Sequence, residues 1–172
     1  MLVRLTLQQM ITAGSVGLRR HIAAIARSLD HHWSGTESDL FDHHIVGAMG
    51  EYAVASVFNL FWHEHVGDIG ERDVGGLIDL RTRRPDNGRD LAIRPKDKDG
   101  KPILLVHARP PEFALVGWIP SASQGRAIGE WNDRARVHFV PGAVPPLLPV
   151  KQLFDLVDAM WLDARHAREA AE

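Results

Sequence analysis

Residues 45–62 form an almost wholly apolar segment, IVGAMGEYAVASVFNLFW, whose one charged residue is Glu51. Because its apolar residues cover nearly all sides of a helix, the segment predicts a helix over about residues 43–61, buried in the middle of the fold. A lone buried carboxylate costs several kcal/mol unless it is paired, protonated or bound to a metal. Glu51 is therefore either a functional carboxylate or the partner of an arginine or a loop.

A short strand with alternating charges follows the apolar segment. The sequence RDVGGLIDLRT predicts a strand over Leu77–Thr82, in which Asp79 and Arg81 share one face. The double glycine before the strand could fold Asp73 back toward Asp79. Two carboxylates that meet in this way repel each other unless a cation lies between them, and Mg²⁺ binds such oxygen ligands. The two aspartates therefore predict a divalent-metal site.

The rest of the chain predicts short strands between two further helices, and the fold class is α/β (α+β). We expect a mixed central sheet of about four or five strands flanked by helices. A polar connection follows at 120–136, with one helical turn near Glu130 and Trp131. The 172 residues predict one domain, with an N-terminal helical segment (1–30), a core (43–149) and a C-terminal helix (150–172). Further strands are expected at Leu91–Arg94, Ile103–Ala108, Phe113–Ile119 and Val137–Val140.

An apolar stripe at helical spacing runs along the first helix, which has Thr6 as its predicted N-cap. We expect this stripe to pack on the helix's own domain, and the alternative is a homodimer seam. Gly14 and Gly17 weaken the middle, so the segment predicts either two helices or one kinked helix. The stripe consists of Leu7, Ile11, Leu18, Ile22, Ile25 and Leu29.

The distribution of charge favours a phosphate-rich partner more than the net charge of −2 does. Residues 81–101 hold eight Arg and Lys side chains against four Asp, a local charge of +4, and such a patch can contact nucleic acid. A solvated surface is the alternative. The chain has no cysteine, as is typical of a reducing compartment, and no apolar run long enough to cross a membrane. We therefore expect a cytoplasmic protein. The phosphate contacts are expected to come from residues of the basic patch, Arg83, Arg84, Arg94, Lys96 and Lys98.

Three short motifs in a fixed order, GAMGEYAVA, DVGG and IDLRT, lie within residues 47–82. Their order resembles the core of the PD-(D/E)xK nuclease superfamily, which has the restriction-endonuclease-like fold. The likeness is greatest to small phage and prophage proteins with a GAxGExAVA helix, a DVG turn and a VRT strand, and it covers about residues 43–149. If the chain is phage-encoded, its compartment is the host cytoplasm.

The resemblance implies a metal-dependent nuclease that cleaves nucleic acid, with DNA as the expected substrate. It implies that Asp73, Asp79 and the carbonyl of Leu80 hold Mg²⁺ or Mn²⁺, and that Glu51 is a further ligand or supports the ligands from behind. Arg81 stands where the superfamily has a lysine, and it would neutralise the scissile phosphate.

Two departures from the superfamily pattern open an alternative. The gap between Asp73 and Asp79 is short, and an arginine stays protonated and cannot easily act as a base. The alternative is a catalytically inactive module of the same fold that binds nucleic acid or a protein partner. A helix-flanked interaction protein outside this fold is a third hypothesis, although it leaves Glu51, Asp79 and Arg81 without a role.

Overall fold

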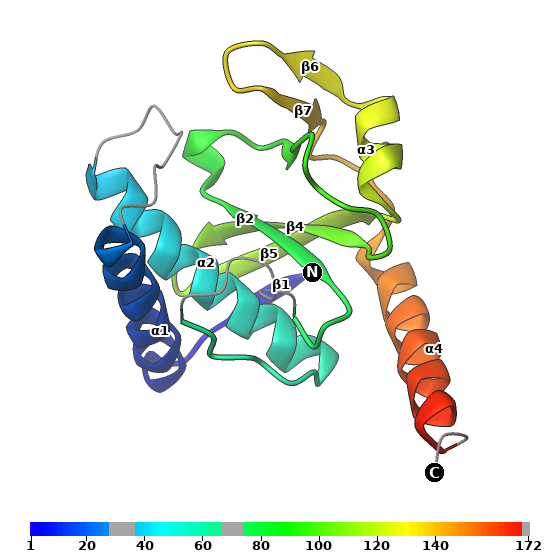
Figure 1. The fold of residues 1–172 in the computed structure, drawn as a ribbon, viewed down its shortest axis with the longest axis horizontal. Helices are drawn as coiled ribbons and strands as arrows, with labels where there is room; N and C mark the ends of the chain where they lie inside the picture. Colours follow the sequence, from blue (N-terminus) through cyan, green and yellow to red (C-terminus); the bar gives the residue numbers. More distant parts are fainter. Residues whose placement is uncertain (28–36, 67–73, 170–172) are drawn as a thin grey trace.

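The computed structural model describes the backbone of residues 1–27, 37–66 and 74–169 (Figure 1). The described part contains four α-helices, a four-stranded mixed sheet and a three-stranded sheet, which confirms the predicted α+β class. The helices are α1 (Leu7–Ala26), α2 (Glu37–Phe58), α3 (Ala122–Ile128) and α4 (Val150–Glu169), and a short 3-10 helix, η1, spans Pro85–Asn87. The strands are β1 (Leu2–Arg4), β2 (Asp79–Arg83), β3 (Leu91–Ile93), β4 (Ile103–Arg109), β5 (Glu112–Ile119), β6 (Glu130–Asn132) and β7 (Val137–Val140).

The larger sheet has the strand order β1-β5-β4-β2. Strand β2 runs parallel to β4, while the β4–β5 and β5–β1 pairs are antiparallel. Strand β4 is buried on both faces, and its residues alternate between two hydrophobic clusters. Leu104 and Val106 pack against α2 and α4, whereas Ile103 and Leu105 pack against β3 and β7 on the other face. Strand β1 is an addition that the sequence analysis did not predict.

Strands β3, β7 and β6 form a separate antiparallel sheet, which α3 covers. The expectation that the strands at Leu91 and Val137 join the main sheet was therefore wrong, because they pair with each other. The expected helical turn near Glu130 and Trp131 was also wrong, since both residues lie in strand β6. The helical turn lies earlier, in α3, where the Ser121 side chain caps the N-terminus.

Helix α2 is the predicted central helix with shifted ends. It begins at Glu37, before the start predicted near residue 43, and it ends at Phe58. Asn59 follows with φ of 51°, a left-handed conformation that stops a helix, so residues 59–62 lie outside it. The helix packs across the main sheet, and its apolar residues supply a large part of the first hydrophobic cluster.

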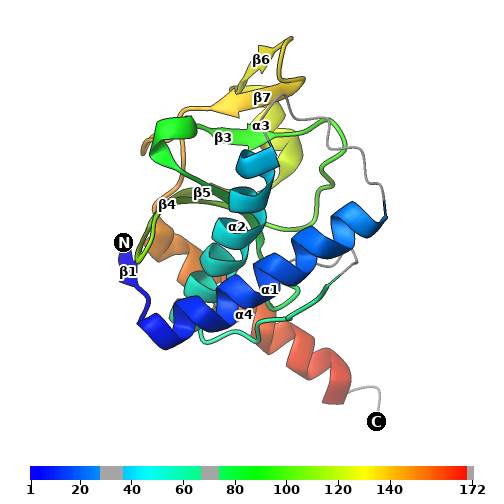
Figure 2. The ribbon, with the colours of Figure 1, turned by 90° about the vertical axis from the view of Figure 1, so that its left-hand side faces the viewer.

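Helix α1 is one continuous helix that lies across α2 as the outermost layer (Figure 2). Its N-terminus has a capping box formed by Thr6 and Gln9. Its buried positions are Ala13, Val16, Gly17, Arg20 and Ala24, most of them small. The described part of the apolar stripe, from Leu7 to Ile25, instead faces outward, so the expectation that it packs on its own domain was wrong there. Leu29 lies outside the described residues.

Close approach of the two helices explains which side of α1 faces inward. A Cβ on Gly17 would lie 2.5 Å from the Cα of Ile45, and that atom belongs to the backbone of α2. Larger side chains would hold the helices apart, so the small face of α1 packs inward and its large residues are left outside.

Gly17→Ala is expected to lower the free energy of unfolding by about 1–3 kcal/mol, because the added methyl group meets backbone that no rotamer change can move. Gly47→Ala in α2 is the matched control. A Cβ there would meet nothing within 4 Å, so the variant should gain about 0.5–1 kcal/mol from helix propensity. Urea unfolding followed by circular dichroism measures both values. Equal effects of the two substitutions would contradict the close contact of α1 with α2.

Candidate functional site

Strand β2 presents two chemically different faces. In its parallel register with β4, Leu80 and Thr82 lie beside residues of the cluster under α2. Thr82 packs so closely on α2 that a Cβ on Gly50 would lie 2.2 Å from its Oγ1. Asp79 and Arg81 lie on the opposite face, as the alternation of the sequence predicted.

Arg81 joins two carboxylates on that face. Its Nη1 lies 2.5 Å from Oδ1 of Asp79, and its Nη2 lies 2.8 Å from Oδ2 of Asp97. The same Nη1 also donates to the carbonyl of Leu80 at 3.2 Å. Asp97 accepts a second hydrogen bond, from the backbone N–H of Arg94 at 2.8 Å. We call this group the Asp79–Arg81–Asp97 cluster.

The cluster is largely shielded from solvent, and its charges are matched to that environment. The side chain of Asp97 is only 9% exposed and that of Arg81 18%. Burial acts to lower the pKa of Arg81, but the charges of Asp79 and Asp97 and their hydrogen bonds outweigh it, so the pKa is raised above its ordinary value. The cluster is therefore a stable ion pair network in which the guanidinium stays charged.

Arg94 adds a second guanidinium beside the cluster. Its pKa is lowered from the ordinary value, first by partial loss of hydration and then by the positive charge of Arg81. Its side chain is nevertheless exposed, and an arginine stays protonated in proteins. Arg94 therefore brings a charged, solvent-accessible group to the edge of the cluster.

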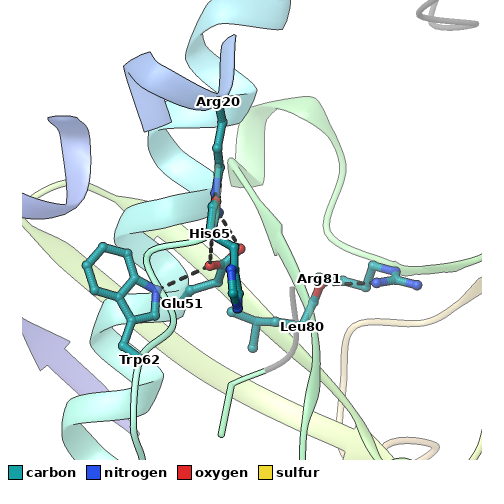
Figure 3. Close-up of polar contacts among 6 residues, drawn as sticks. All are labelled: Arg20, Glu51, Trp62, His65, Leu80 and Arg81. Atoms are coloured by element: carbon teal, nitrogen blue, oxygen red, sulfur yellow. Dashed lines mark hydrogen bonds and ion pairs between the residues drawn. The ribbon is translucent and has the colours of Figure 1, made fainter. Parts of the chain in front are cut away.

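Glu51 has a different set of partners. Its two carboxylate oxygens each accept a hydrogen bond at 2.8 Å from Arg20 of α1, in a buried bidentate pair (Figure 3). Trp62 Nε1 donates to the same carboxylate at 3.2 Å, and Arg20 Nε donates to the carbonyl of His65 at 2.9 Å. Glu51 therefore has the salt bridge to an arginine that the sequence analysis weighed against a functional role.

The structure brings Asp79 and Arg81 together but does not bring Glu51 to them. Figure 3 shows Leu80 pointing to the side of Glu51, while Arg81 extends in the opposite direction. The expectation that Glu51 joins Asp79 at one metal site was therefore wrong, because β2 lies between them. Asp73 lies outside the described residues, so its expected approach to Asp79 stays a prediction.

The described residues do not fit a divalent cation at the cluster. Carboxylate oxygens are suitable ligands for Mg²⁺, but those of Asp79 and Asp97 already bind the Arg81 guanidinium, which supplies the positive charge between them. An ion there would have to displace Arg81. Within residues 1–27, 37–66 and 74–169, no group of three or more metal-binding side chains converges.

The five basic residues expected to contact phosphate divide into two sets. Arg84 is held by Asp42 through two hydrogen bonds of 2.5 and 2.7 Å. Arg83 donates to the carbonyl of Asp90 at 2.8 Å, lies 5.3 Å from the ring centre of Phe139, and has its pKa lowered, mainly by burial. The second set, Arg94, Lys96 and Lys98, lies on an exposed turn.

Asp97 and Arg20 are site residues that the sequence did not predict. Asp97 lies in the basic stretch of residues 81–101, and its packing against β2 depends on the path of β3. Arg20 carried a usable signal, because it falls in helical register with Ala13, Gly17 and Ala24. A charged residue on a small-residue face indicates a buried partner.

Comparisons with known proteins leave the resemblance as an expectation. Protein-family models, curated proteins and solved structures were each searched, and none matches this chain. Among the described helices, none has the length and apolar character that a membrane span requires.

Proposed function

We propose that the protein is a catalytically inactive module with a nuclease-like order of motifs, and that it binds nucleic acid. The observation that carries the proposal is the position of Arg81, whose guanidinium lies between Asp79 and Asp97. Mg²⁺ or Mn²⁺ between acidic side chains would be needed to activate water for phosphodiester cleavage.

Two further contacts support an inactive site. A guanidinium held by two carboxylates has few donors left for a phosphate, and it cannot easily serve as a base. Both oxygens of Glu51 accept hydrogen bonds from Arg20, so this carboxylate is bound in a structural pair. In this proposal Glu51, Asp79 and Arg81, to which the resemblance assigns chemistry, act as ion-pair partners that stabilise the fold.

The proposed nucleic-acid surface consists of the basic turn, residues 94–101, and the β6–β7 hairpin. Asp97 is paired with Arg81 and only 9% exposed, so the exposed charge of the turn is that of Arg94, Lys96, Lys98 and Lys101 against Asp99. Helix α3 connects the two parts: its Ser123 N–H donates to Asp99 at 2.7 Å, and it leads directly into β6. At 1.5 Å per residue, its seven residues span about 10 Å.

The hairpin offers groups of the kind that bind single strands. Trp131 is 46% exposed, and Arg134 and Arg136 are exposed on the same hairpin. Exposed aromatic rings stack on bases while neighbouring cations contact the phosphates, so the combination suits single-stranded nucleic acid without sequence preference.

Replacing Lys96 and Lys98 together by alanine is expected to flatten the salt dependence of binding. Each lost phosphate contact should reduce the log–log slope by about 0.7 on single strands and about 0.9 on duplex DNA. Fluorescence anisotropy with labelled oligonucleotides, in EDTA and at several salt concentrations, measures the slope. Arg84→Ala is the matched control, because Asp42 already holds that side chain. An unchanged slope in the double variant would remove the basic turn from the proposal.

The alternative, an active Mg²⁺- or Mn²⁺-dependent nuclease, is tested with the same oligonucleotides. The proposal expects no cleavage by the wild type in Mn²⁺. Cleavage that EDTA stops and Asp79→Asn abolishes would replace the proposal with the nuclease hypothesis. Self-association through α1, the other partner expected from the sequence, concerns a different face of the protein.

A further inference from the structure

Helix α1 carries five large aliphatic side chains on the side that faces away from α2. We call this surface the outer face of α1, and its side chains are 41–71% exposed. Figure 2 shows the helix as the outermost layer, with α2 behind it. The outer face consists of Leu7, Ile11, Leu18, Ile22 and Ile25.

Scattered single apolar residues on a surface are ordinary, but these five are contiguous. They recur at intervals of three, four or seven residues, so they form one stripe along a helix of 20 residues, about 30 Å long. Ser15, which is also exposed, fills the gap between Ile11 and Leu18. The inward side of α1 already packs on α2. An apolar stripe on the outward side as well is typical of a helix that packs against apolar partners on two opposite sides.

We propose that the outer face of α1 binds the outer face of a second copy of the chain, with the two helices antiparallel. The pairing is isologous, so each copy contributes the same residues around a two-fold axis. The main sheet and the basic turn take no part in this contact, and the inference does not rest on the proposed binding of nucleic acid.

The area of the outer face is suited to a dimer. Five half-exposed aliphatic side chains offer on the order of 300–500 Å² of apolar surface, as large as the largest patch on a typical monomer. Two copies would bury on the order of 600–1,000 Å² from these side chains alone, and flanking polar residues would bring the total near the 1,200 Å² of a small specific interface. A second α1 is also the partner whose length and shape match the stripe along its whole extent.

Charge selects the antiparallel orientation. The sequence of α1 contains Arg19, Arg20 and His21 and no acidic residue. Arg20 is buried, but Arg19 is 55% exposed beside the outer face and makes one ion pair, at 3.3 Å with Glu64 of its own chain. In a parallel pair the two Arg19 side chains would lie at the same level and repel each other. In an antiparallel pair they lie on opposite sides of the axis, and the helix dipoles oppose each other favourably.

The stripe also defines the register. Its centre lies between Ser15 and Leu18, so the two-fold axis passes there. Ile11 of one copy then lies opposite Ile22 of the other, and the small Ser15 lies opposite the large Leu18. Large and small residues therefore interdigitate at the centre of the contact, as close helix packing requires.

Ile22→Lys tests the face. Sedimentation equilibrium on the full chain should give a mass near twice 19.1 kDa for the wild type at micromolar concentration, with self-association weakened by at least about 30-fold in the variant. Ile128→Lys is the matched control, an isoleucine of 42% exposure on α3, and it should remain a dimer. Far-ultraviolet circular dichroism should be the same for all three proteins. A monomeric wild type, or an Ile22→Lys protein that is folded and still dimeric, would overturn the proposal.

Single cysteines test the orientation, because the chain has no cysteine of its own. Two helices whose axes are 8–10 Å apart bring facing Cα atoms within disulfide range. Ile11→Cys and Ile22→Cys proteins are oxidised separately and as a mixture, and the products are separated without reductant. The antiparallel register expects a strong cross-link only in the mixture. Cross-linking of each variant with itself, and none between the two, would overturn the antiparallel arrangement.

Discussion

Removing Arg20 while Glu51 remains is expected to lower the free energy of unfolding by about 3–5 kcal/mol. The buried Glu51 carboxylate would then keep the hydrogen bond from Trp62 and lose both hydrogen bonds from Arg20, and the carbonyl of His65 would lose the hydrogen bond from Arg20. For a chain of this length, such a loss lowers the melting temperature by roughly 10 °C or more. Arg20→Met roughly keeps the volume of the side chain. The change in the free energy of unfolding of this variant, measured by chemical unfolding, therefore reports the loss of the positive charge.

The neighbouring ion pair provides the control. Arg19 and Glu64 make a similar contact at 3.3 Å, but both side chains are more than half exposed. Arg19→Met should therefore change the free energy of unfolding by less than about 1 kcal/mol. Equal effects of Arg19→Met and Arg20→Met would contradict the buried pair.

The double variant Arg20→Met, Glu51→Leu separates the pair from its surroundings. A buried ion pair replaced by apolar residues of similar volume is often neutral, so the double variant should recover most of the stability lost by Arg20→Met alone. If Glu51 were instead a metal ligand with a free carboxylate, Glu51→Gln would leave stability unchanged and would abolish metal-dependent activity. The structure predicts the reverse, a loss of stability.

Arg81→Ala is expected to lower the free energy of unfolding by about 2–4 kcal/mol, because Asp79 and Asp97 would lose the positive charge between them. The two carboxylates would then have the arrangement that favours a divalent cation. Mn²⁺ or Mg²⁺ should therefore raise the melting temperature of Arg81→Ala and leave that of the wild type unchanged. Differential scanning fluorimetry over a range of metal concentrations measures both responses.

Two variants control this experiment. Arg81→Lys keeps one positive charge in the same place, so it should lose less stability and respond less to metal. Arg109→Ala removes an exposed arginine that pairs with Asp86 at 3.3 Å, and it should change little. If metal stabilises the wild type as strongly as Arg81→Ala, then Arg81 does not take the place of the cation.

The sequence predicted where the helices and strands of this fold lie better than it predicted which side of each is buried. The apolar run around Glu51 predicted α2, and the alternation in IDLRT placed Asp79 and Arg81 on one face of β2 correctly. The stripe of α1 was recognised as a stripe, but periodicity alone does not say which side of a helix is buried. Gly17 decides the side, because only the small face of α1 can approach the backbone of α2.

The candidate site could be predicted only where its residues are neighbours in the sequence. Asp79 and Arg81 are two residues apart, and their contact follows from strand geometry. Asp97 meets Arg81 across a turn between β3 and β4, while Arg20 and Glu51 are 31 residues apart on two helices. Such contacts depend on the packing of whole elements, and one sequence does not specify that packing through local patterns.

The pairing of β1 with β5 has a consequence for the order of folding. It joins Leu2–Arg4 to residues 112–114, so the main sheet cannot be completed until most of the chain has been synthesised. Helices α1 and α2 are close in sequence and can associate much earlier. During synthesis the α1–α2 hairpin can therefore form first, held by Arg20 and Glu51, and the apolar residues of α2 that pack on the main sheet stay uncovered until its strands pair.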